Sequence, residues 1–155
     1  MPSCPVVVPS GEIRTGVISA RIDQYDVIVM SQSCDLAPEG PKVDLVLVSP
    51  VWPLSQFAES TEGFYRSIEG KEAIRRGNAP GYHMLNKCNL PCFNKEVLVV
   101  DFHNVYGVPY AFLDGLLKAQ DKRLRLLPPY KEHLSQAFAR FFMRVGLPVD
   151  IPPFK

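Results

Sequence analysis

The sequence of 155 residues lacks any hydrophobic run of the ~20 apolar residues that a membrane-spanning helix needs. Its first five residues, Met-Pro-Ser-Cys-Pro, also lack the basic and apolar regions of a secretory signal peptide. We therefore expect no membrane contact and a cytoplasmic location, where the four cysteines are reduced.

An excess of charge of one sign is lacking too, because 17 Lys and Arg oppose 16 Asp and Glu to give a net charge of +1. No overall field would recruit nucleic acid. Basic residues nevertheless crowd the last third of the chain, where we expect a local basic face. They are Lys118, Lys122, Arg123, Arg125, Lys131, Arg140 and Arg144.

Several motifs that carry chemistry are missing. There is no glycine-rich phosphate loop, no Gly-x-Ser-x-Gly elbow and no His-Glu-x-x-His, so we expect no cofactor. The nearest approach to a metal site is His83-x4-Cys88-x3-Cys92, which lacks a Cys-x2-Cys pair and needs a fourth ligand from elsewhere. We favour no metal there and keep a zinc-stabilised interaction module as an alternative.

Proline is abundant, with 15 residues, which predicts short strands and defined loops. The length suits a single domain spanning the whole chain. Near-continuous apolar runs predict a buried central strand over residues 27–33 and a second over residues 43–49, stopped by Pro50 and Pro53. Further strands are expected over residues 13–22, 82–85, 97–102 and 123–127, with a loop over residues 86–94.

Helical patterns are fewer. Residues 54–81 are interpreted as an insertion with a short helix over residues 68–76 that ends at Gly77, and residues 109–119 have helical spacing. The clearest helix covers about residues 130–145, between Pro128-Pro129 and the expected cap Gly146. Its apolar face is assigned to the core: Leu134, Ala137, Phe138, Phe141, Phe142 and Val145.

This order of elements predicts a mainly β (α+β) fold. Few helices separate the strands, which favours a small antiparallel barrel over a doubly wound parallel sheet. The core strands would lie at about residues 13–49 and 82–127, followed by the C-terminal amphipathic helix.

Six landmarks follow one another along the chain. They are a glycine in the first strand, an apolar strand ending in Ser, an apolar strand running into Pro, an apolar strand with an Asp, an Arg-Leu pair and a C-terminal helix. Their positions are Gly16, 27–31, 43–50, 97–101, Arg123-Leu124 and 131–145. This order resembles the MazF/PemK-like toxin family, and the resemblance implies an SH3-like barrel. It covers most of the chain outside the ends and residues 54–81.

The resemblance implies RNA recognition but not RNA cleavage. The family's catalytic Arg falls here at Tyr25-Asp26 and its Thr near Val51-Trp52, so neither group is retained. We therefore expect a protein of a bacterial or phage conflict system, either toxin–antitoxin or antiviral defence. It would bind RNA or a protein partner encoded nearby, without the family's endoribonuclease activity, and a homodimer is compatible with this.

The expected site is the mouth of the barrel, at the end of the strand over residues 27–33. Aromatic rings there would stack on bases and arginines would contact phosphates. The proposed binding residues are Tyr25, Gln32, Trp52, Arg123 and Arg125, with Ser31 beside them, and Tyr106 and Tyr110 as further stacking faces.

The alternative is an active hydrolase or nuclease. Cys34 would be its nucleophile, with Asp35 adjacent and His103 as the base. The simpler interpretation is a small buried Cys34 with Asp35 capping a turn. Likewise, the segment Asp101-Phe102-His103-Asn104 either does acid–base work or ends a strand by bonding its own backbone.

Overall fold

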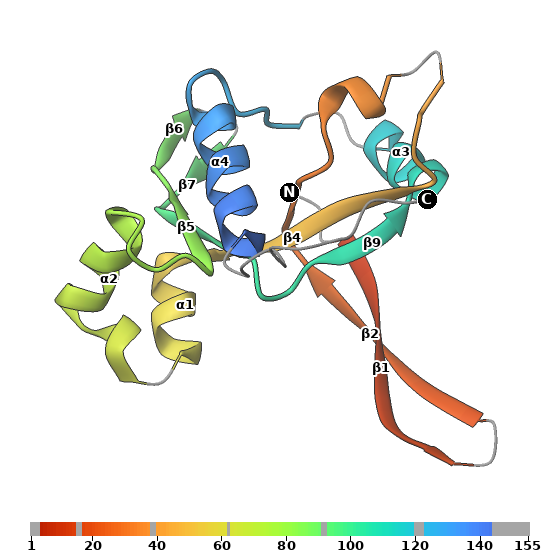
Figure 1. The fold of residues 1–155 in the computed structure, drawn as a ribbon, viewed down its shortest axis with the longest axis horizontal. Coiled ribbons are helices and arrows are strands. Elements are labelled where there is room, and N and C mark those ends of the chain that lie inside the picture. The colour runs from red at the N-terminus through yellow and green to blue at the C-terminus, as the bar shows by residue number, and fades with distance from the viewer. Residues whose placement is uncertain are drawn as a thin grey trace, which may run out of the picture.

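The computed structural model describes residues 4–14, 17–37, 40–61, 63–90, 93–119 and 123–143. These residues form a mixed α+β fold that is mainly β, and their paired strands are all antiparallel (Figure 1). The predicted fold class is therefore confirmed. Within the described residues no pairing joins the two outer strands of the central sheet, so the sheet is open.

Strand β4 is the centre of this sheet. Strand β3 pairs with one of its edges, while β8 and β9 both pair with the other edge, and β5 pairs with the far side of β8. The bounds are β3 Val27–Val29, β4 Leu45–Pro53, β5 Tyr82–Leu85, β8 Leu98–Asp101 and β9 Tyr106–Pro109. Residues 48–51 of β4 are all buried, as expected for a strand whose two faces are both covered.

The prediction of a buried central strand over residues 27–33 is wrong. Strand β3 has only three residues and lies at the edge of the sheet, with Val29 37% exposed. The pairing ends because the Ser31 hydroxyl accepts a hydrogen bond from the Leu47 N–H at 2.9 Å, in place of a backbone carbonyl. The chain then turns into a 3-10 helix, η1 (Ser33–Asp35).

Pro50 explains why two strands share one edge of β4. The Val51 N–H donates to Asp26 O on the β3 side at 2.8 Å, so the nitrogen of Pro50 faces the β8–β9 side. Proline has no N–H, and the ladder on that side is interrupted at this point. Val51 pairs with Val100 and Val48 with Tyr106, so five residues, 101–105, leave the ladder opposite Ser49 and Pro50.

Helices cover both faces of the sheet. Successive residues of a strand point to opposite faces, so Val51 and Trp52 pack against different helices. Helix α4 covers the face of Val51 and Val100, while α1 and α2 pack with Val99 and Trp52, and α3 packs on Val46 farther along. The bounds are α1 Leu54–Ser60, α2 Ile68–Arg75, α3 Tyr110–Lys118 and α4 Tyr130–Phe142, with the 3-10 helix η2 at Gly63–Arg66.

A long hairpin projects away from the rest of the molecule (Figure 1). It is formed by β1 (Cys4–Arg14) and β2 (Val17–Tyr25). Its base is held in the core, where Cys4 is buried against Val46 and Val48. A second, small hairpin of β6 (Cys88–Leu90) and β7 (Phe93–Lys95) replaces much of the loop predicted over residues 86–94.

Three further predictions need comment. The helix expected over residues 68–76 is confirmed, since Ser67 caps α2 and Gly77 follows it with φ +74°. The strand expected over residues 123–127 is absent, because alternation alone does not supply a partner strand. Phe142 is 57% exposed and is not a core residue, although Phe138 and Phe141 pack as predicted. Gly16, Arg144, Val145 and Gly146 lie outside the described residues.

Among the described helices, none combines the length and the apolar character that a membrane span requires.

Gly70 tests the packing of α2 on η2. A Cβ at this position would lie 2.7 Å from Tyr65 Cα and overlap the carbonyl oxygen of Phe64. We expect Gly70→Ala to lower the free energy of unfolding by ~1–3 kcal/mol. Gly115, in α3, has no neighbour within 4 Å of its built Cβ, so the control Gly115→Ala should raise it by ~0.5–1 kcal/mol. Urea unfolding measures both changes, and a Gly70→Ala protein as stable as the parent would contradict this packing.

Candidate functional site

The interruption at Pro50 creates a polar turn on the sheet. Asp101, which is 8% exposed, accepts hydrogen bonds from the His103 N–H at 2.9 Å, the His103 Nδ1 at 3.0 Å and the Asn104 Nδ2 at 2.7 Å. These three donors satisfy a carboxylate that would otherwise be costly to bury. This geometry favours the strand-ending interpretation of residues 101–104.

The ring of His103 is held on several sides. Its centroid lies 4.8 Å from that of Tyr82 and 5.3 Å from that of Phe141, and a Cβ at Gly81 would overlap it. In the tautomer in which Nδ1 donates to Asp101, Nε2 is the acceptor nitrogen. About half of the side chain, 49%, is exposed. His103 is thus oriented by Asp101 and accessible from solvent.

Three aromatic rings meet beside this turn. The Tyr25 ring stacks on Tyr106 at 5.9 Å and meets Trp52 edge-on at 5.5 Å. The structure therefore brings together two of the predicted binding residues, Tyr25 and Trp52. The Tyr25 hydroxyl donates to Asp23 at 3.0 Å, and burial raises the pKa of this tyrosine. With a carboxylate so close, the cluster is a poor place for a phosphate backbone.

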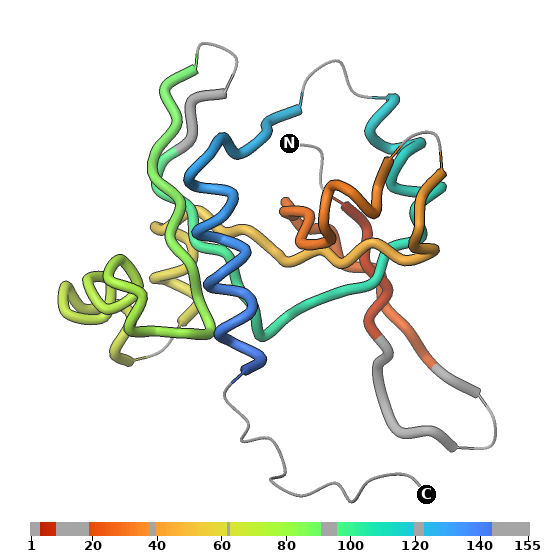
Figure 2. Tube along the Cα trace, turned by 45° about the horizontal axis from the view of Figure 1, so that its top comes forward, coloured from red at the N-terminus to blue at the C-terminus, as the bar shows by residue number. Residues whose placement is uncertain are grey.

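Cys34 and Asp35 lie elsewhere. They form part of η1, where Cys34 is exposed and its Sγ lies 3.7 Å from Asp35 Oδ1. The interpretation of Cys34 as a buried core residue is therefore wrong. Figures 1 and 2 place η1 beside α3 and residues 101–105 near the C-terminal end of α4. Within the described residues no hydrogen bond joins Cys34 to His103, so the structure does not assemble this pair.

The remaining predicted residues are also dispersed. Gln32 is exposed at the start of η1, and its side chain does not cap that turn. Arg123 and Arg125 are exposed on the segment that leads into α4. Among the described residues no three His, Cys, Asp or Glu side chains could hold a metal ion. Of the zinc ligands considered from the sequence, Cys92 lies outside the described residues.

The structure also contains a cleft that the sequence did not predict. It lies between α2 and α4, over β5, and has a volume of about 250 Å³. We call it the α2–α4 cleft. The polar side chains that line it, apart from the Tyr82 hydroxyl, are Arg75, Arg76, His83, His133, Gln136 and Arg140.

The charge around this cleft is unbalanced. Glu72 accepts two hydrogen bonds from Arg75, at 2.7 and 2.6 Å, and one from Arg76 Nε at 2.7 Å. These bonds lower the pKa of Glu72 to about 2, so it is ionised at neutral pH. Arg140 forms no ion pair with any described residue. Three arginines and one glutamate leave an excess of two positive charges.

His83 forms part of the floor of the cleft, on the face of the sheet that α4 covers. Burial lowers its pKa, and the nearby His133 lowers it further. His83 is therefore neutral at neutral pH and can still donate one N–H. The two histidines come from β5 and α4, which are far apart in the sequence.

A signal for this cleft was present in the sequence. His133, Gln136 and Arg140 follow one another at helical spacing, on the side of α4 away from its apolar stripe. Arg75 and Arg76 stand at the end of α2, just before Gly77. Sequence reasoning identified the polar side of α4 but had no means of placing α2 opposite it.

Comparison of the chain with protein-family models, curated proteins and solved structures found no match. The resemblance to the MazF/PemK-like family therefore depends on the ordered landmarks alone, and membership of that family remains a proposal.

Asp101 offers a test of the turn at Pro50. Asp101→Ala leaves the donors of His103 and Asn104 without their acceptor, so we expect the free energy of unfolding to fall by ~1–3 kcal/mol. The control Asp35→Ala removes a side chain whose only described hydrogen bond is to Cys34, and should change it by less than ~0.5 kcal/mol. Equal stability of the two variants in urea would show that Asp101 does not hold the turn.

Proposed function

We propose that this protein binds RNA without cleaving it, as a MazF/PemK-like barrel protein of a bacterial or phage toxin–antitoxin or defence system. The observation that supports binding most directly is the α2–α4 cleft, where arginines from two helices leave an excess of positive charge. Cationic grooves of this kind track the phosphates of single strands. The family resemblance favours RNA as the nucleic acid.

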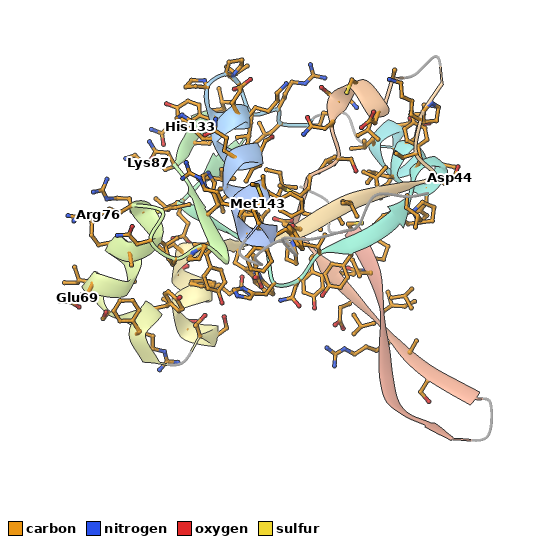
Figure 3. The ribbon with its side chains drawn as sticks, viewed as in Figure 1. Asp44, Glu69, Arg76, Lys87, His133 and Met143 are labelled. Atoms are coloured by element: carbon orange, nitrogen blue, oxygen red, sulfur yellow. The ribbon has the colours of Figure 1, made fainter. Side chains whose placement is uncertain are left out.

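The charge extends beyond the cleft. Figure 3 shows Arg76, which follows α2, and Lys87, which follows β5, on the same flank of the molecule, with Glu69 of α2 farther along it. Lys87 is exposed and forms no ion pair with the described residues. Lys87 thus adds one cation, unpaired among the described residues, to the side where we place the RNA.

Two observations favour binding over catalysis. Cys34 and His103, the predicted nucleophile and base, are not joined by any described hydrogen bond. The positions where the family resemblance places its catalytic Arg and Thr hold Tyr25-Asp26 and Val51-Trp52, and Tyr25 and Trp52 pack against each other. Neither arrangement supplies an activated nucleophile or a cation for a transition state.

Arg140 provides the main test of RNA binding. We expect Arg140→Ala to weaken binding of a fluorescent single-stranded RNA about five- to tenfold, because a charge-assisted contact is lost. It should also reduce the slope of log K against log salt by about 0.7. Fluorescence anisotropy at several salt concentrations measures both quantities.

The matched control is Arg21→Ala. Arg21 is on the projecting hairpin and is paired with Asp23 at 2.9 Å, so this variant loses the same charge away from the cleft and should bind RNA normally. Equal weakening in both variants would mean that net charge alone drives binding. If no RNA binds while a protein encoded nearby does, the proposal gives way to the protein-partner alternative.

The absence of cleavage is a separate prediction. Purified protein incubated with a mixture of single-stranded RNAs should leave them intact on a denaturing gel, because the structure does not assemble Cys34 with His103. The outcome that would contradict this is specific cleavage that disappears in both Cys34→Ala and His103→Ala proteins of unchanged circular dichroism. The active-hydrolase alternative would then replace the binding function.

A further inference from the structure

We propose that the α2–α4 cleft recognises a phosphomonoester group, carried either by the end of an RNA chain or by a free mononucleotide. This inference rests on the proposed function in the first case and is independent of it in the second. The distinction between a terminal and an internal phosphate follows from the size, the donor set and the charge of the cleft.

The size of the cleft suits a small anionic group. Its volume of about 250 Å³ equals the liquid volume of ~8 water molecules. It is bounded by α2, β5 and α4, so neither a helix nor a duplex fits inside it. A phosphate with part of its sugar or base is the size of ligand that this space takes. Apolar atoms of Ile74, Pro80, Met84 and Ala137 provide walls for such a group.

The donors converge from three elements. Arg75 and Arg76 come from the end of α2, His83 from β5, and His133 and Arg140 from α4. Arg76 uses only Nε in its bond to Glu72, and Arg140 makes no described ion pair, so both retain terminal N–H groups for a ligand. Guanidinium groups bind phosphate oxygens in pairs, which gives direction as well as affinity.

No Asp or Glu side chain is among the described residues that line the cleft, so no carboxylate there would repel a bound anion. Glu72 does not line it and accepts hydrogen bonds from Arg75 and Arg76. The remaining excess of two positive charges matches in magnitude the two negative charges of a phosphomonoester that has lost both protons. An internal phosphodiester carries only one negative charge and leaves half of this excess unmatched.

The histidines add to the preference. His83 and His133 both line the cleft, and the pKa of His83 is lowered by burial and further by His133. A dianion in the cleft would favour the protonated form of His83. Tyr82 also lines the cleft, and its pKa is raised by burial, so its hydroxyl stays protonated and adds no negative charge.

The test compares one single-stranded RNA in three forms: with a 5′-phosphate, with a 3′-phosphate and with hydroxyls at both ends. We expect one phosphorylated form to bind about tenfold more tightly than the hydroxyl form by isothermal titration calorimetry. A nucleoside monophosphate and inorganic phosphate are titrated separately. They show whether the group is recognised without an RNA chain.

Variants locate the effect. Arg140→Ala should abolish the preference for the phosphorylated ligand, and Arg140→Lys should restore only part of it, because an ammonium group cannot form the paired contact. Lys131 is exposed on α4 and does not line the cleft, so Lys131→Ala should leave the preference unchanged. Circular dichroism confirms folding, which is expected because Arg140 and Lys131 are both exposed.

The two proposals fail in different ways. If the three forms of the RNA bind equally and neither the monophosphate nor inorganic phosphate binds, the phosphomonoester site is overturned and the proposed function stays intact. Binding of the monophosphate with no binding of any RNA supports the site and overturns the RNA-binding function. A preference that survives Arg140→Ala places the phosphate elsewhere and also overturns the site.

Discussion

The missing N–H of Pro50 is the constraint on which the rest of the sheet depends. A strand with partners on both edges normally excludes proline from its interior, because each proline removes one hydrogen bond of the ladder. In β4 the chain on the affected edge leaves the ladder for residues 101–105 and returns as β9. The strand keeps its length, and the sheet acquires a polar turn at its centre. Ser49 Oγ, beside Pro50, is buried without a described partner, which is a cost of this break.

The electrostatics of the cleft arise from the fold and not from composition. Arg75 and Arg76, at the end of α2, precede the polar side chains of α4 by more than fifty residues. Both sets nevertheless line the same cleft over β5. Glu72 holds the two arginines by short hydrogen bonds, which restricts their rotamers. A chain with a net charge of +1 can therefore present a locally cationic cleft, because no carboxylate is among the described residues that line it and Glu72 offsets only one of its three arginines.

Much of the fold could be predicted from the sequence, because apolar periodicity and glycine caps are local signals. The helices at residues 68–75, 110–118 and 130–142 and the strand at Tyr82–Leu85 were expected close to where they occur. The order of burial could not be predicted. Residues 27–30 and 45–48 are both apolar runs, and only the number of neighbouring strands makes β4 central and β3 an edge. Pro50 was interpreted as a stop, since a sequence does not reveal that the partner strand is broken.

The candidate site was predicted only in part for the same reason. Tyr25 and Trp52 do meet, but Cys34 and His103 follow β3 and β8, which pair with opposite edges of β4. The end of a strand is a local property that sequence reasoning can identify. Which strand ends share an edge is a property of topology. The cleft is harder still, because it needs the packing of α2 against α4 across an edge strand, and no spacing rule relates residues 75 and 140.

The turn at Pro50 and the cleft are physically linked through Phe102. This residue lies within the segment that leaves the ladder, and its N–H donates to Gly81 O at 2.9 Å, which fixes the connection between α2 and β5. Its buried ring packs against Phe138 at 5.4 Å and Phe141 at 6.1 Å, which positions α4. One residue therefore contacts elements on both sides of the cleft. The bond between the Phe102 N–H and Gly81 continues the register of the β5–β8 ladder, so the residue that begins the turn opposite Pro50 also positions the two helices that carry the arginines.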